Sequence, residues 1–168
     1  KVPAILYNVP SRTGCSLAAS TVAYLAKNAE YVTAIKEASG DISHVADIMY
    51  ACDGAIDLYS GNDDQIVPIL SLGGKGVISV LSNVAPKETH DIVALFLEGK
   101  IKESRELQLK ALPLVHALFS EVNPIPVKAA LNLMGKEVGP LRLPLTEMEA
   151  AHQEVLAEEM KKFGIKLA

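Results

Sequence analysis

Tryptophan is missing from this sequence of 168 residues, and only two cysteines occur. Cys15 and Cys52 lie far apart and form no Cys-X-X-Cys pair, which argues against a disulfide framework and favours a reducing compartment. We expect both to be buried free thiols. Long apolar runs are also lacking, since none approaches the roughly 18 residues of a membrane span, and no signal peptide is recognisable. We therefore expect a soluble, cytoplasmic protein with no membrane partner.

An excess of one charge is lacking as well. The chain has 16 basic and 20 acidic residues, a formal net charge of -4, with the two signs interspersed. Because no basic stripe is present to neutralise phosphates, nucleic acid is excluded as a partner. The four histidines lack metal-ligand spacing, so we expect no metal and no cofactor. What the chain does have is an apolar fraction of 49%, ample for a packed core.

Short β-rich runs alternate with stretches of helical spacing, a pattern typical of βα units and a parallel sheet. The runs are Pro3 to Asn8, Tyr31 to Glu37, Ala55 to Ser60 and Gly76 to Val80. Between and after them, Asp41 and either Asn62 or Asp63 are suited to cap helices, and Pro86 suits a first helical turn.

After residue 98 the β-rich runs stop and only helical patterns follow. Helices are predicted at Lys100 to Phe119, Ile125 to Met134 and Glu147 to Phe163. A capping box of Thr146 and Glu149 is expected to open the last helix. The sequence thus predicts a sheet-containing domain over residues 1–98 and a helical domain over residues 99–168.

Four βα units cannot close an eight-stranded barrel, which takes about 250 residues. They would leave two open sheet edges and an exposed apolar face. Another polypeptide could supply the missing half, two copies could pair, or the sheet could be open and doubly wound. We expect the first, for reasons that come from the sequence motifs below, and because Lys1 leads directly into a strand we also consider truncation or cleavage. The predicted fold is α/β, the second half of a TIM (β/α)8 barrel followed by a small helical domain.

Lys36 stands at the C-terminal end of an otherwise apolar strand, which is the catalytic side of a parallel barrel. Apolar neighbours reduce the hydration of an ammonium group and favour the neutral amine, which can attack a carbonyl. This is what Schiff-base chemistry needs. Taken alone, the position is better explained by a strand-end lysine that reaches out to solvent.

Tyr7 ends the preceding strand, and the ends of adjacent parallel strands lie about 5 Å apart, so Tyr7 and Lys36 could face one cavity. A phenol there could pass protons to and from a lysine-bound substrate, although simple packing is the alternative. Arg12 lies in the loop that follows, where it could hold a substrate carboxylate or be a solvated charge.

Gly61 and Ile78 belong to the ends of the other two predicted strands. Gly61 would let a ligand approach the main chain, and main-chain groups near Ile78 could receive a small acid; turn and core roles are the alternatives. The glycine-rich run from Gly73 to Gly76 is not a phosphate loop, because it leads from helix to strand and lacks the GK[ST] sequence.

Five strings in this order and spacing resemble the dihydrodipicolinate synthase family of pyruvate-dependent class I aldolases. They are YNVPSRTG (7–14), IKEASG (35–40), SGND (60–63), GVISV (76–80) and NPIPVKAALNLMG (123–135). Each string alone is weak, but together they extend the resemblance over the whole chain.

The resemblance implies a lyase of the diaminopimelate pathway to lysine that condenses pyruvate with aspartate semialdehyde. Lys36 would form the imine with pyruvate, and Tyr7 would donate and accept protons. Arg12 matches the residue that receives the carboxylate of the second substrate, and Gly61 and Ile78 match backbone positions near pyruvate. The family also implies a homo-oligomer, a dimer of dimers.

The departure from the family is large, because its members carry a further N-terminal half with four more βα units, a pyruvate-carboxylate loop and two partners of the proton relay. We therefore expect the chain to need that half as a partner. Two alternatives remain: a related pyruvate aldolase of the N-acetylneuraminate lyase or keto-deoxy-sugar type, which Arg12 disfavours, and a non-catalytic half-barrel module.

Overall fold

The computed structural model describes all 168 residues, which form two compact units, Lys1–Ser79 and Val80–Ala168. Each unit has an apolar core of its own. The packing boundary precedes the expected domain boundary at residue 98, because helix α5 (Pro86–Leu97) packs on helix α6 (Ile101–Leu118). In that contact Ser104 Oγ donates to the Ile92 carbonyl at 2.6 Å. Where the domains of a complete barrel divide stays a prediction.

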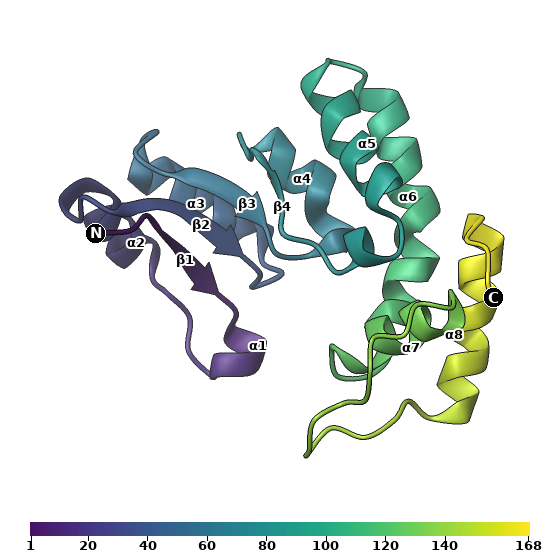
Figure 1. The fold of residues 1–168 in the computed structure, drawn as a ribbon. Coiled ribbons are helices and arrows are strands. Elements are labelled where there is room, and N and C mark those ends of the chain that lie inside the picture. Colours follow the sequence, from purple (N-terminus) through teal and green to yellow (C-terminus); the bar gives the residue numbers. More distant parts are fainter. The chain divides into compact units, whose positions relative to one another are not determined.

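The first unit contains a parallel four-stranded sheet in the order β1-β2-β3-β4 (Figure 1). Its strands are β1 (Ala4–Asn8), β2 (Val32–Glu37), β3 (Asp57–Ser60) and β4 (Gly76–Val77). All four expected strands are therefore present. β4 is shorter than expected, although the Ile78 N–H still donates to the Ser60 carbonyl at 2.8 Å.

Helices cover one face of this sheet, behind the strands in Figure 1. They are α2 (Ala19–Asn28), α3 (Ile42–Cys52) and α4 (Ile66–Ser71). Ile35 of β2 and Leu58 of β3 are fully buried in the cluster that these helices form with the sheet. Covering of one face is the pattern of a barrel segment, whereas a doubly wound sheet has helices on both faces.

The other face of the sheet is open. Ile5, Tyr7 and Ile78 are 51%, 47% and 42% exposed, although large apolar and aromatic side chains are normally buried. Since successive residues of a strand point to opposite faces, Ile5 and Tyr7 lie on the same side of β1. The expected apolar inner face is therefore present and uncovered in this chain.

Some local details differ from the sequence predictions. Asp41 caps α3 as expected, accepting from the Ser43 and His44 amides, because its carboxylate meets the free N–H groups of the first turn. Asn62 precedes the 3-10 helix η1 (Asp63–Gln65) but forms no side-chain cap. The expected capping box is wrong: α8 begins at Ala150, and the Glu149 N–H donates to Glu121 instead, at 3.0 Å.

The two cysteines differ in their exposure to solvent. Cys52 is buried at the end of α3, and burial raises the pKa of its thiol. Cys15 is exposed, which corrects the expectation that both are buried. It lies in the segment after the one-turn helix α1 (Pro10–Thr13), which contributes no residue to the core.

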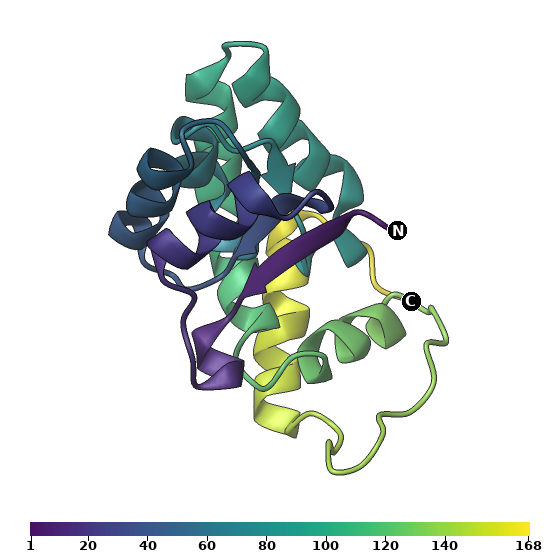
Figure 2. The same ribbon diagram turned by 90° about the vertical axis from the view of Figure 1, so that its left-hand side faces the viewer.

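The second unit is helical. It contains the 3-10 helix η2 (Leu81–Asn83), α5, α6, α7 (Ile125–Leu133) and α8 (Ala150–Phe163). A long connection joins α7 to α8 (Figure 2). Leu114 and Leu118 of α6 pack in one core with Leu156 and Met160 of α8, all at most 1% exposed. None of the helices, α6 included, combines the length and apolar character that crossing a bilayer requires.

Candidate active site

Lys36 and Tyr7 form the centre of the candidate site. Strand register pairs Tyr7 of β1 with Lys36 of β2, so both side chains leave the sheet on the same open face. The Lys36 Nζ lies 4.0 Å from the centroid of the Tyr7 ring. The predicted meeting of these two side chains at the C-terminal ends of adjacent strands is therefore found in the structure.

A second tyrosine continues the row across the sheet. Register pairs Lys36 with Tyr59 of β3, and Tyr59 with Gly76 of β4. A Cβ at Gly76 would lie 3.7 Å from the Tyr59 ring, so this ring lies beside the backbone of β4. Tyr59 was not predicted as a site residue, although its place near the end of the third expected strand was a usable signal.

Gly61 lies directly against Lys36. A Cβ at this position would stand 2.6 Å from the Ala38 Cβ, a distance that real side chains do not show, and 3.0 Å from the Lys36 Cε, which is a tight contact. The Gly61 N–H donates to the Glu37 carbonyl at 2.7 Å. The space beside Gly61 is thus bordered by Ala38 and Lys36, and the expected approach of a ligand to the Gly61 main chain stays a prediction.

The other two predicted residues follow strands: Ile78 comes directly after β4, and Arg12 lies beyond the end of β1. The Ile78 N–H donates to the Ser60 carbonyl at 2.8 Å, which ties Ile78 to the end of β3; a contact of Ile78 with a ligand stays a prediction. Arg12 was expected in a loop, but it is exposed on α1, directly after β1. The turn is fixed because the Val9 carbonyl accepts from the Arg12 N–H at 2.9 Å.

A buried polar pair beneath the site was missed by sequence analysis. Asn8 and Glu37, the residues after Tyr7 and Lys36, are 1% and 2% exposed and hydrogen-bonded at 2.9 Å. Polar residues at the ends of two apolar strands were the available signal, but sequence alone does not tell whether such side chains point to solvent or into the core.

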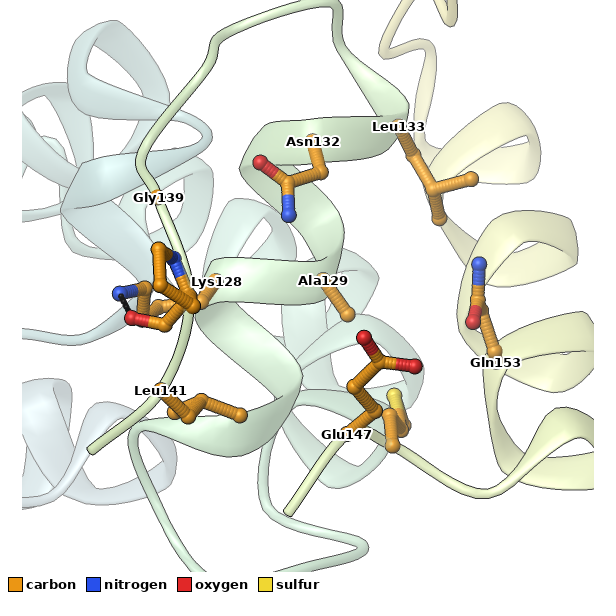
Figure 3. Close-up of a pocket in the computed structure, with 10 residues that line it drawn as sticks. Lys128, Ala129, Asn132, Leu133, Gly139, Leu141, Glu147 and Gln153 are labelled. Atoms are coloured by element: carbon orange, nitrogen blue, oxygen red, sulfur yellow. Dashed lines mark hydrogen bonds between the residues drawn. The ribbon is translucent and has the colours of Figure 1, made fainter. Parts of the chain in front are cut away.

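No three histidine, cysteine, aspartate or glutamate side chains lie together as metal ligands. A cavity of about 320 Å³ lies elsewhere, in the second unit (Figure 3). Its walls come from α7, α8 and the connection between them, and the Lys128 Nζ donates to the Pro140 carbonyl at 2.7 Å, tethering this connection to α7. None of the predicted site residues lines this cavity.

The family model and the curated relatives that match this chain carry related names. Residues 1–163 match the family model described as the dihydrodipicolinate synthetase family. The 4-hydroxy-tetrahydrodipicolinate synthase of Lachnoclostridium phytofermentans is 62% identical over 98% of this chain and 56% of its own length. The enzyme of the same name from Caldicellulosiruptor bescii is 59% identical over 98% of this chain and 55% of its own length.

Solved structures agree. Dihydrodipicolinate synthase from Thermotoga maritima superposes with a TM-score of 0.94 at 43% identity, covering 96% of this chain and 56% of that one. The enzyme from Aquifex aeolicus gives a TM-score of 0.94 at 37% identity, covering 99% and 57%. The chain thus spans little more than half the length of the relatives it matches. Because the family model matches residues 1–163 of its 168 residues, the chain belongs to the dihydrodipicolinate synthetase family.

Proposed function

We propose that this chain is the lysine-bearing part of a 4-hydroxy-tetrahydrodipicolinate synthase, a cytoplasmic lyase of the diaminopimelate pathway that condenses pyruvate with L-aspartate 4-semialdehyde. One observation carries the proposal. The Lys36 Nζ lies 4.0 Å from the Tyr7 ring centroid on the open face of a parallel sheet, at the strand ends where such folds carry their chemistry. An amine and a phenol together supply a nucleophile and a proton carrier.

The reaction follows from these two groups. The neutral Lys36 amine attacks C2 of pyruvate, and the carbonyl oxygen leaves as water to give an imine. Loss of a proton from C3 gives an enamine, whose C3 attacks the aldehyde carbon of the second substrate while the aldehyde oxygen takes up a proton. The amino group of that substrate then attacks the imine carbon, which closes the ring and releases Lys36. Tyr7 carries protons in these steps.

Three further residues have proposed roles. Arg12, exposed on α1 after β1, would receive the aldehyde substrate's carboxylate through its fork of N–H donors. Gly61 keeps space for the Lys36 side chain beside the pyruvate position, since any side chain there would meet the Lys36 Cε. The Ile78 carbonyl would border pyruvate on the β4 side. No cofactor takes part.

The active molecule in this proposal is larger than the chain. The four strands would form the second half of a (β/α)8 barrel within residues 1–98, with residues 99–168 as its helical domain. An N-terminal half with four more βα units would cover the exposed Ile5, Tyr7 and Ile78 and supply the rest of the substrate site. We expect the completed protein to be a homotetramer, and the chain alone to be inactive or weakly active.

Borohydride trapping tests the proposal on the complete barrel, with the N-terminal half present. Incubation with pyruvate and reduction should fix one pyruvate-derived group on Lys36, located by peptide mass spectrometry. An adduct at another residue, or none, would reject imine formation at Lys36. Turnover of aspartate semialdehyde should exceed turnover of sialic acid or keto-deoxy sugars, and the reverse would indicate the related aldolases.

A non-catalytic module is distinguished by the same material. If the chain serves only as a half-barrel scaffold, the complete protein would give no trapped adduct and no turnover on any of these substrates.

A further inference from the structure

Asn8 and Glu37 form a buried pair on the face of the sheet opposite to Tyr7 and Lys36. Each follows one of these two residues in sequence, and the strand register pairs the two with each other. The Asn8 Nδ2 donates to the Glu37 Oε2 at 2.9 Å, and the side chains are 1% and 2% exposed. A buried carboxylate is costly unless it is hydrogen-bonded, so this pair strongly favours one geometry.

Glu37 forms hydrogen bonds with two chain segments that lie beside Lys36. Its second oxygen, Oε1, accepts from the Ser39 N–H at 2.6 Å. Its main-chain carbonyl accepts from Gly61, the residue whose missing side chain leaves space for the Lys36 Cε. The carboxylate and carbonyl of one residue therefore hold the segment after β2 and the glycine that lies against the lysine.

Asn8 holds a different segment. Its Oδ1 accepts from the Leu17 N–H at 3.0 Å, and its Nδ2 lies 3.5 Å from the Ser16 Oγ. The chain from residue 9 to residue 16 is thus closed at its base by one amide side chain. This closed segment contains α1 and Arg12.

We propose that Asn8 and Glu37 act as positioning residues that hold the Arg12 segment in a fixed place relative to the Lys36 and Tyr7 pair, and thereby set the affinity for the aldehyde substrate. The inference rests on the proposed imine chemistry at Lys36. Two apolar side chains could fill this space without the cost of burying a carboxylate. What they could not do is bind the main chain of the Arg12 segment and that of the lysine strand through one connected network.

Reversing the hydrogen bond tests this proposal in the complete protein. Asn8→Asp places two carboxylates face to face, and Glu37→Gln, which keeps the volume, sets amide against amide. The double variant N8D/E37Q restores one carboxylate and one amide with the donor now on β2, while the Leu17 and Ser39 N–H groups keep oxygen acceptors. Asn28→Asp, at an exposed site at the end of α2, is the matched control for the added charge.

We expect each single variant to raise KM for aspartate semialdehyde about tenfold or more, because small misplacements of substrate-holding groups are costly. KM for pyruvate should rise less. In the double variant, KM for aspartate semialdehyde should lie within about threefold of the value for the unmodified protein, because the restored hydrogen bond holds the Arg12 segment in place. N28D should leave both values unchanged.

The outcomes separate the two proposals. If the unmodified protein traps no pyruvate on Lys36, the proposed function fails. If it does trap pyruvate, but the single variants lose only thermal stability and keep both KM values, the pair is merely structural and the inference is overturned. A double variant no better than the singles also overturns it. Should Asn8→Asp not fold, the comparison of E37Q with the double variant decides.

Discussion

The two units differ in the polar side chains that they bury. In Lys1–Ser79, Glu37 and Asp63 are carboxylates at 2% exposure, while Ile5 and Tyr7 are about half exposed. In Val80–Ala168 the buried polar residues, Thr89, Ser104 and Gln108, are all uncharged, although this unit also exposes large apolar side chains such as Leu97 and Leu143. Burying a carboxylate costs stability unless it is hydrogen-bonded. The first unit therefore carries a cost that the second does not, and Glu37 carries it directly beside Lys36, at the centre of the candidate site.

The largest expected effect comes from a substitution at the candidate site in the first unit. Lys36→Ala should lower kcat in the complete protein by about 10³-fold or more, because loss of a covalent nucleophile removes the reaction path itself. The unfolding midpoint should change little, since Lys36 is only partly buried. Steady-state kinetics and thermal unfolding check the two expectations together.

Lys75→Ala is the control, because Lys75 is exposed and precedes β4 at the opposite end of the strand. Equal loss of activity in both variants would contradict a special role for Lys36.

Packing in the second unit should show the reverse pattern. Leu156→Ala removes a fully buried side chain of α8 and should lower the free energy of unfolding by about 2–5 kcal/mol. Molecules that remain folded should still trap pyruvate on Lys36. Val155→Ala on the same helix, at 52% exposure, should change stability by less than about 0.5 kcal/mol. Denaturant unfolding and trapping measure the two effects; loss of trapping in folded protein would argue against separate roles.

The glycines at the site sharpen the comparison further. Gly61→Ala should cost about 1–3 kcal/mol of stability and reduce trapping at Lys36, because the new Cβ would overlap Ala38 and press on the Lys36 side chain. Gly76→Ala is the matched control, since its Cβ would meet the Tyr59 ring at an ordinary 3.7 Å. Gly76→Ala should keep a higher unfolding midpoint and a higher adduct yield than G61A. The opposite ranking would refute the steric account.

The smallest expected effect is on the loss of stability at low pH. The His152 ring, whose Nδ1 lies 2.8 Å from the Glu121 Oε1, holds the pKa of Glu121 below its ordinary value. A lowered folded-state pKa gives stability above the unfolded value of about 4.3, and this stability is lost as the pH falls through the folded value. Unfolding midpoints between pH 6 and 3 should therefore fall more steeply for the unmodified protein than for Glu121→Gln.

Glu137→Gln, at an exposed position in the connection before α8, serves as the control for this comparison. A slope in E121Q as steep as that of the unmodified protein would remove the role assigned to the pair of His152 and Glu121.

Much of the sheet and the pair of Tyr7 and Lys36 could be predicted from sequence, because the spacing of apolar residues allows few choices for the strands and for their parallel alignment. Placing Tyr7 and Lys36 at the ends of successive strands was enough to predict that they meet. The limits appear where tertiary contacts decide: Thr146 and Glu149 fit a capping box locally, yet the Glu149 N–H bonds to Glu121, 28 residues away in sequence. The direction of the Asn8 and Glu37 side chains likewise depends on segments that close over them.

Strand β1 has β2 as its neighbour on one side and forms the rim of the sheet on the other. A polypeptide that extends the sheet there would bind through main-chain amides and carbonyls, which are the same for any sequence. Selection of the correct neighbour must then come from the side chains of that strand that stand upright on its uncovered face, Ile5 and Tyr7. In the proposed complete barrel, Tyr7 would thus help to recognise the N-terminal half in addition to its proposed role in proton transfer.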